Sequence, residues 1–67
     1  MDYNLNGLDI TVEYNGFWSR DRFNVIEFWI THVGNKKCKK TVDIWLQKRM
    51  NDFQIEDLQN AISAWEN

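Results

Sequence analysis

Apolar residues at every second position are the feature that most constrains what this chain of 67 residues can fold into. Three segments, 8–14, 26–30 and 42–46, show this period of two, which is typical of half-buried β-strands. The apolar residues all have even numbers: Leu8, Ile10, Val12 and Tyr14; Ile26, Phe28 and Ile30; Val42, Ile44 and Leu46. The pattern predicts three strands that present one shared apolar face.

Two polar breaks separate the three segments and predict hairpin turns. The first is SRDR at residues 19–22, and the second is GNKK at residues 34–37. Glycine and asparagine in the second break suit the positive φ angles of tight hairpins. The three strands are therefore expected to form an antiparallel meander.

The register of this sheet follows from the parity of the apolar residues. Pairing even positions with even positions predicts Tyr14 beside Phe28 in the first hairpin. A slip by one residue would mix carboxylates into the apolar set, so this register is strongly preferred. The remaining predicted neighbours are Val12 with Ile30, Ile30 with Val42, Phe28 with Ile44, and Ile26 with Leu46.

A C-terminal helix is predicted to cover the apolar face of the sheet, beginning after an N-cap at Gln54. Its apolar residues recur at helical spacing. The fold class expected is α+β, a three-stranded antiparallel sheet with one helix on one face, in the order β-β-β-α. Residues 1–67 form one small domain, in which residues 1–7 are a short arm. The helical stripe consists of Ile55, Leu58, Ala61, Ile62 and Trp65.

Residues 41–53 also fit a helix, and this alternative stays open. Thr41 is a suitable N-cap for such a helix. The fold would then be a β-hairpin followed by two helices. The helical stripe in that case consists of Val42, Trp45, Leu46, Met50 and Phe53.

The reactive side chains are too few for catalysis or for a closed metal site. The chain has one histidine, His32, and one cysteine, Cys38, whereas a structural zinc site takes four nitrogen or sulfur ligands. Carboxylates on an open sheet face do not flank a cleft, as glycoside hydrolysis requires. We expect no enzymatic activity, no catalytic residue, no metal and no cofactor.

The sheet face away from the helix is the predicted partner-binding surface. Trp29 and Trp45 have odd numbers and so are expected on this face, where two exposed tryptophans indicate a contact with another protein. Carboxylates around them would add charge complementarity. The same face could pair with its own copy in a homodimer. The other expected members are Asp9, Glu13, Glu27, Asp43 and Val25.

Six of the eight basic residues lie in or directly after the two predicted turns and are candidate phosphate contacts. The formal net charge of −2 speaks against strong non-specific binding to nucleic acid. A nucleic-acid-binding β3α domain is therefore the less favoured alternative. The candidates are Arg20, Arg22, Lys36, Lys37, Lys39 and Lys40.

Composition also bears on where the protein acts. A lone cysteine fits a reducing compartment, and no apolar run reaches the roughly 20 residues of a membrane span, so a cytoplasmic location without a membrane partner is expected. Eight asparagines with many lysines and isoleucines favour an origin in a phage or mobile element. The expected function is a small protein-binding inhibitor or adaptor that occludes a larger target.

A few residues and the predicted order of elements carry a resemblance to known domains. The residues are Gly16, Trp18, the stretch Arg20 to Arg22, Phe53 and Ala61. Together with the β-β-β-α order, they make residues 8–65 similar in architecture to the DNA-binding domains of tyrosine-integrase arms and of one class of plant transcription factors. The resemblance implies that the sheet face away from the helix enters the major groove. In those families this face is rich in arginine and lysine, whereas here it carries carboxylates.

Overall fold

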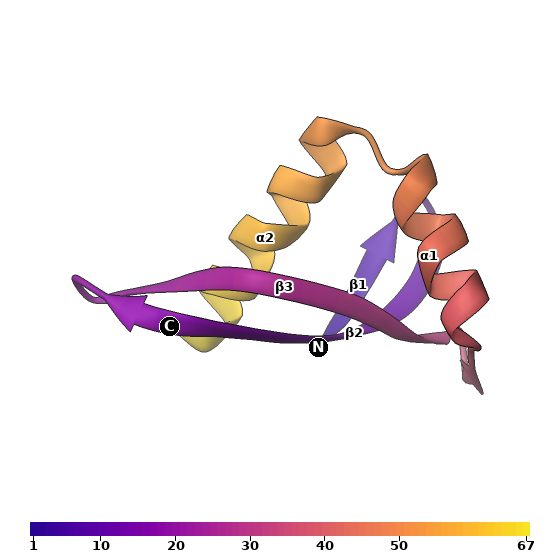
Figure 1. Ribbon diagram of the computed structural model, residues 1–67, viewed down its shortest axis with the longest axis horizontal. Coiled ribbons are helices and arrows are strands. Elements are labelled where there is room, and N and C mark those ends of the chain that lie inside the picture. Colours follow the sequence, from indigo (N-terminus) through magenta and orange to yellow (C-terminus); the bar gives the residue numbers. More distant parts are fainter.

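The computed structural model describes residues 1–67 and has the predicted α+β class, with a four-stranded antiparallel sheet and two helices. The strands follow one another in the sheet in the order β1-β2-β3-β4. Both helices lie on one side of the sheet (Figure 1). The elements are β1 (Asp2–Leu5), β2 (Leu8–Ser19), β3 (Arg22–Val33), β4 (Lys36–Lys37), α1 (Lys40–Arg49) and α2 (Asp52–Glu66).

The long hairpin of β2 and β3 has the predicted register at its centre. Tyr14 pairs with Phe28, and Val12 pairs with Ile30. The turn consists of Arg20 and Asp21, whose φ angles of 53° and 62° are both in the left-handed region. Two consecutive residues of this kind make the tight turn whose twist matches that of the flanking strands.

Two bulges in β3 limit how far the predicted register holds. Ile26 and Thr31 have no partner in β2. Because successive side chains point to opposite faces, each extra residue exchanges the two faces for the rest of the strand. Val25 consequently packs against the core, and Ile26 is 66% exposed. The prediction that Ile26 faces the core and Val25 the outer face is wrong.

The predicted N-terminal arm is the first strand of the sheet. β1 joins β2 through Asn6 and Gly7, whose φ angles are 51° and 90°. An Asn-Gly pair is the preferred sequence for this turn because both residues tolerate positive φ. Tyr3, the second residue of β1, pairs with Ile10 and packs against the core.

The predicted third strand is wrong. The two helices of the alternative are present, but the sheet has four strands and not the two of a hairpin. Residues 42–46 belong to α1, and the strand after the second turn has only two residues, Lys36 and Lys37. Helical spacing places Asp43 and Leu46 on one side of α1, and both are buried, as is Met50 at the C-cap of the helix. α1 follows Lys39, which makes no side-chain cap, rather than the expected Thr41.

Helix α2 begins three residues earlier than predicted, at a capping box. The Asn51 side chain accepts a hydrogen bond from the Gln54 amide at 2.8 Å. The Gln54 side chain accepts one from the Asn51 amide at 2.9 Å. This reciprocal pair satisfies two free amides at the start of the helix and makes Asn51 the N-cap. Gln54 is therefore the third residue of the helix and not its N-cap.

The core lies between the sheet and the two helices, and both helices contact β3. No helix in the structure has the length and apolar character needed to cross a bilayer. The buried apolar side chains are Ile10, Val12, Phe23, Ile30, Leu46, Met50, Leu58 and Ile62.

Candidate interaction surfaces

The predicted acidic face with two tryptophans exists only in part. Glu13 and Trp29 are cross-strand partners, and the indole nitrogen of Trp29 donates a hydrogen bond to Glu13 at 3.2 Å. Glu27 accepts one from the Asn15 side chain at 2.8 Å. Asp9, further along β2, is bonded to the Asn4 side chain at 2.9 Å. The outer sheet face thus carries three of the four predicted carboxylates and one tryptophan.

Three residues predicted for this face lie elsewhere. Asp43 and Trp45 belong to α1, and Val25 packs against the core because of the bulge at Ile26. Asp43 is 1% exposed, whereas Trp45 is 53% exposed. The prediction that Trp29 and Trp45 share one face is therefore wrong, because it depended on a third strand that is a helix.

Asp43 is a structural carboxylate that joins α1 to the edge of β3. It accepts hydrogen bonds from the Ile30 amide at 2.8 Å, from the Gln47 side chain at 2.7 Å and from the Lys40 ammonium at 2.9 Å. Burial acts to raise the pKa of Asp43, but these hydrogen bonds and the Lys40 charge outweigh it and hold the pKa below 3.8. Asp43 is therefore charged, satisfied and inaccessible to a partner.

Along the outer edge of β3, backbone groups that a further strand would otherwise pair with have hydrogen-bond partners in the helices and in the loop before α1. The Gln47 side chain donates to the Phe28 carbonyl at 3.3 Å, and the Ser63 hydroxyl of α2 donates to the Phe23 carbonyl at 2.7 Å. The Cys38 thiol donates to the Ile30 carbonyl at 3.2 Å. The sequence carries no local signal for these contacts, because their partners are 8 to 40 residues apart.

Positive charge is concentrated in residues 36–49, which comprise β4 and α1. This segment has six basic residues and one acidic residue, so its net charge is +5. Since the whole chain carries −2, the remaining residues carry −7. Arg20 and Arg22 are at the other end of β3, so the six predicted phosphate contacts do not form one group. The basic residues of 36–49 are Lys36, Lys37, Lys39, Lys40, Lys48 and Arg49.

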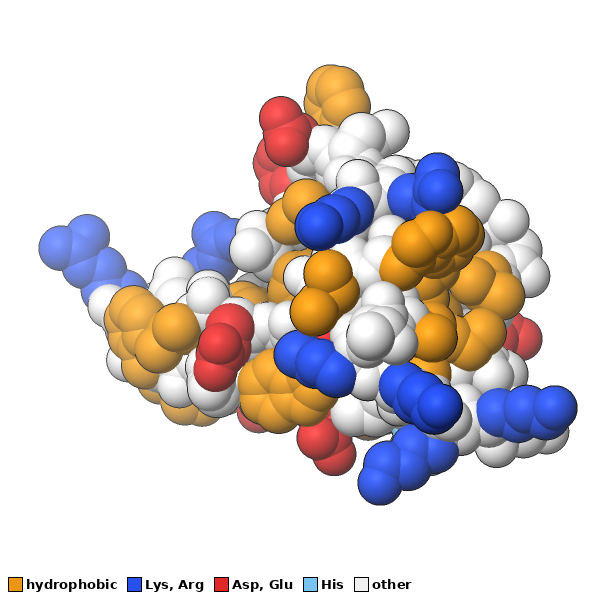
Figure 2. All heavy atoms as spheres, turned by 45° about the vertical axis from the view of Figure 1, so that its right-hand side comes forward, with side chains coloured by type: hydrophobic (Ala, Val, Ile, Leu, Met, Phe, Trp, Pro, Cys, Tyr) orange, Lys and Arg blue, Asp and Glu red, His pale blue; other side chains and the backbone are white.

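The outer side of α1 combines this charge with exposed apolar side chains. Val42, Ile44 and Trp45 are 38%, 44% and 53% exposed. The Arg49 guanidinium carbon lies 4.0 Å from the centre of the Trp45 ring, which is the geometry of a cation–π contact. Figure 2, in which the α1 end of the molecule is turned toward the viewer, shows hydrophobic side chains bordered by Lys and Arg. We call Val42, Ile44, Trp45, Lys48 and Arg49 the α1 face.

A second exposed apolar group lies at the end of the β2–β3 hairpin, which extends past α2 (Figure 1). Phe17 and Trp18 are 53% and 52% exposed. The Trp18 ring meets the edge of Phe23 at 5.6 Å between ring centres, and Tyr14 meets Phe23 at 5.7 Å. Three aromatic rings therefore lie in a row on the helix side of the hairpin.

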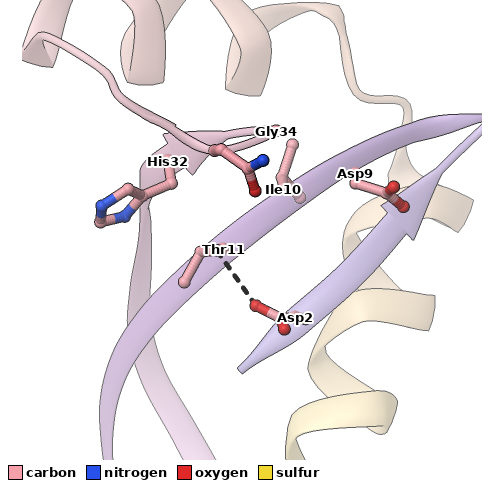
Figure 3. A pocket seen from close by; sticks show the side chains of 7 residues that line it. Asp2, Asp9, Ile10, Thr11, His32 and Gly34 are labelled. Atoms are coloured by element: carbon pink, nitrogen blue, oxygen red, sulfur yellow. Dashed lines mark hydrogen bonds between the residues drawn. The ribbon is translucent and has the colours of Figure 1, made fainter.

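A shallow hollow on the outer sheet face holds His32, but its polar groups do not converge. Asp2 accepts a hydrogen bond from Thr11 at 3.0 Å, and the His32 ring lies 2.9 Å from the Thr31 hydroxyl. Figure 3 shows the His32 ring pointing away from both Asp2 and Asp9. No three His, Cys, Asp or Glu side chains come close enough together to bind a metal ion. The hollow has no pair of groups arranged for acid–base chemistry.

Comparison of the chain with protein-family models, with curated proteins and with solved structures finds no match.

Proposed function

We propose that this chain is a non-enzymatic protein-binding module that docks on an acidic protein surface through the α1 face. The observation that carries the proposal is the combination of three exposed apolar side chains on one ten-residue helix with positive charge, +2 on the helix itself and +5 over residues 36–49. Exposed apolar patches rimmed by polar residues are typical of protein contacts. Occlusion of a larger target by such a face is how an inhibitor or adaptor of this size would act.

Trp45 and Arg49 are the expected energetic centre of this interface. Tryptophan and arginine are the residue types most enriched at binding hot spots. The cation–π contact at 4.0 Å holds both side chains in one arrangement before binding, which reduces the conformational entropy lost on association. The partner surface we propose has an apolar patch for Trp45, Val42 and Ile44 and carries Asp or Glu at its rim.

The outer sheet face is the weaker candidate for the same function. Its tryptophan, Trp29, is only partly exposed and already bonded to Glu13 at 3.2 Å. A partner there would have to replace this hydrogen bond, whereas the apolar side chains of the α1 face have no polar contact to lose.

Nucleic-acid binding is the second candidate, because the six basic residues of 36–49 would attract phosphates. Three features favour a protein instead. Exposed Val42 and Ile44 gain nothing from a phosphate backbone, and Arg49 occupies a face of the Trp45 ring on which a base would stack. The net charge of −7 on the remaining residues would also repel a long polyanion.

The test compares two single variants, Trp45→Ala and Trp29→Ala, as tagged bait in a cell lysate and then against the purified partner. We expect Trp45→Ala to weaken binding by about thirtyfold or more, in line with a hot-spot loss of about 2 kcal/mol. Trp29→Ala is the matched control and should retain binding. Thermal melting of both variants must show that each is folded.

Titration with a DNA duplex at several salt concentrations separates the two candidates. We expect no binding at physiological salt. An affinity that falls steeply with salt and is lost in Trp45→Ala would replace the protein-binding proposal with the nucleic-acid one.

A further inference from the structure

We propose that a second copy of this chain binds to the open edge of β2, so that two four-stranded sheets join into one across a two-fold axis. This interface does not involve the α1 face and is independent of the proposed function. The occupant of each open edge is the same β2 segment of the second copy.

The edge of β2 is open over residues 13–19. β1 pairs with β2 only between Leu8 and Thr11. Met1 extends this pairing by one residue, since its ammonium donates to the Val12 carbonyl at 2.9 Å and its carbonyl accepts from the Val12 amide at 2.8 Å. No strand lies beside the rest of β2 on this side, because the sheet order is β1-β2-β3-β4.

Three residues of the open segment direct their backbone groups outward. The backbone groups of Val12 point toward β1, and in an antiparallel strand every second residue points the same way. The bulges lie in β3, so β2 itself has no extra residue that would change this alternation. Tyr14, Gly16 and Trp18 therefore present three N–H donors and three carbonyl acceptors without a strand partner.

The two edges of the hairpin differ in how they are covered. Ile30, Phe28 and Phe23 of β3 have partners in the loop before α1 or in the helices, and both helices contact β3. The outward backbone groups of the open segment of β2 have no such partners. An exposed strand edge of this length, which includes the exposed side chains of Phe17 and Trp18, is a template for pairing with another chain.

One register satisfies all three outward residues in a symmetric pair. Val12 cannot take part because Met1 already occupies it. Antiparallel pairing centred on Gly16 sets Gly16 opposite Gly16 and Tyr14 opposite Trp18, twice by symmetry. This arrangement uses every free donor and acceptor and is self-complementary, as a two-fold interface requires.

The side chains agree with a second copy as the occupant. Tyr14 and Trp18 would meet as cross-strand aromatic pairs beside Phe23, which each already contacts within its own chain. Glu13 would lie opposite Ser19 and next to Arg20 of the other copy, so no charged residue faces a like charge. Residues 13–19 thus complement themselves in both hydrogen bonding and charge.

The test is the mass of the protein in solution, measured by sedimentation from about 1 to about 500 µM. We expect a concentration-dependent dimer for the wild-type chain and a monomer for Trp18→Lys. Trp45→Lys is the matched control, because Trp45 is 53% exposed and Trp18 is 52% exposed. It should dimerise as the wild type does, and circular dichroism should show that both variants fold.

Hydrogen exchange of individual amides locates the interface. The Tyr14, Gly16 and Trp18 amides should exchange at least tenfold more slowly at dimer concentrations than at monomer concentrations. A wild-type chain that stays monomeric throughout, a dimer that persists in Trp18→Lys, or a dimer in which these amides stay unprotected would each overturn the proposal. Loss of the dimer in Trp45→Lys would assign self-association to the α1 face instead.

Discussion

The Asp43 carboxylate accepts a hydrogen bond from the Ile30 amide at 2.8 Å, so that a helix side chain occupies the place of a neighbouring strand. The same carboxylate also binds the side chains of Gln47 and Lys40, and it is 1% exposed. This buried charge is therefore one of the main contacts that hold α1 against the sheet edge, together with the Gln47 bond to the Phe28 carbonyl.

Replacing Asp43 by Ala should destabilise the fold by about 3 kcal/mol, because the buried Ile30 amide loses its partner along with two charge-assisted contacts. A domain of this size has roughly 3–5 kcal/mol in total, so the variant should keep no more than about 2 kcal/mol and unfold at much lower urea concentrations than the wild type. Urea denaturation followed by circular dichroism measures the loss. Glu56→Ala, at an exposed position of α2, is the control and should change stability by less than about 0.5 kcal/mol.

The two tyrosines, the only ones in the chain, should both ionise at unusually high pH. Tyr3 donates a hydrogen bond to Asp57, and Tyr14 donates one to Glu66. These bonds, with partial burial and the negative charge of the acceptors, raise the pKa of each tyrosine from 10.0 to about 12.

Both raised pKa values have the same consequence for stability. The folded state holds the phenol proton more tightly than the unfolded state, so the contribution is complete below pH 10 and is lost as the pH rises through about 12. Absorbance titration of tyrosinate measures this directly. Asp57→Asn should lower the pKa of Tyr3 alone and leave that of Tyr14 high. Two tyrosines that both titrate near pH 10 in the wild type would contradict the two contacts.

The bulge at Ile26 makes adjacent residues respond oppositely to the same change. Ile26→Ser should leave stability within about 0.5 kcal/mol, because this side chain is 66% exposed. Val25→Ser should cost at least about 1 kcal/mol, since Val25 packs against the core. Chemical denaturation of the two variants side by side makes the measurement. If Ile26→Ser lowered stability more than Val25→Ser, Ile26 rather than Val25 would face the core, and the bulge would be absent.

Gly16 should tolerate no side chain, for a reason unrelated to its φ angle. A Cβ atom there would lie 2.1 Å from the Asn24 carbonyl oxygen and 2.7 Å from the Phe23 ring. Gly16→Ala should cost about 3 kcal/mol, at the upper end of overpacking penalties. Gly34→Ala provides the comparison, because Gly34 has open space but a φ of 60°, and its strain should cost only about 1 kcal/mol. Equal melting temperatures for the two variants would argue against close packing of Phe23 on Gly16.

The centre of the β2–β3 hairpin was predictable from the alternation of apolar residues, which sets Tyr14 beside Phe28, as found. The turn alone pairs Ser19 with Arg22 and would set Tyr14 beside Glu27, so the bulge at Ile26 supplies the difference of one residue. The bulges were not predictable, because an apolar residue such as Ile26 looks like a core residue in the sequence. The strand β1 did carry a signal, since Asn6 and Gly7 are the strongest short hairpin pair.

Residues 42–46 could not be assigned by pattern alone, because Val42 and Leu46 satisfy both a period of two and a helical stripe. What favours the helix is the burial of Asp43, which needs donors from Ile30, Gln47 and Lys40 that no local pattern reveals. How much of each candidate surface could be predicted depends on this assignment. Glu13 beside Trp29 followed from the hairpin register, whereas the α1 face exists only because the segment is helical.

The covering of β3 by later parts of the chain has a consequence for truncated products. A chain that ends before residue 43 contains the residues of the hairpin but lacks Asp43, Gln47 and Ser63, so its β3 edge is left without these partners and its β2 edge is open as well. Bare strand edges invite aggregation between neighbouring chains. We therefore expect a chain cut before residue 43 to aggregate far more readily than the whole chain.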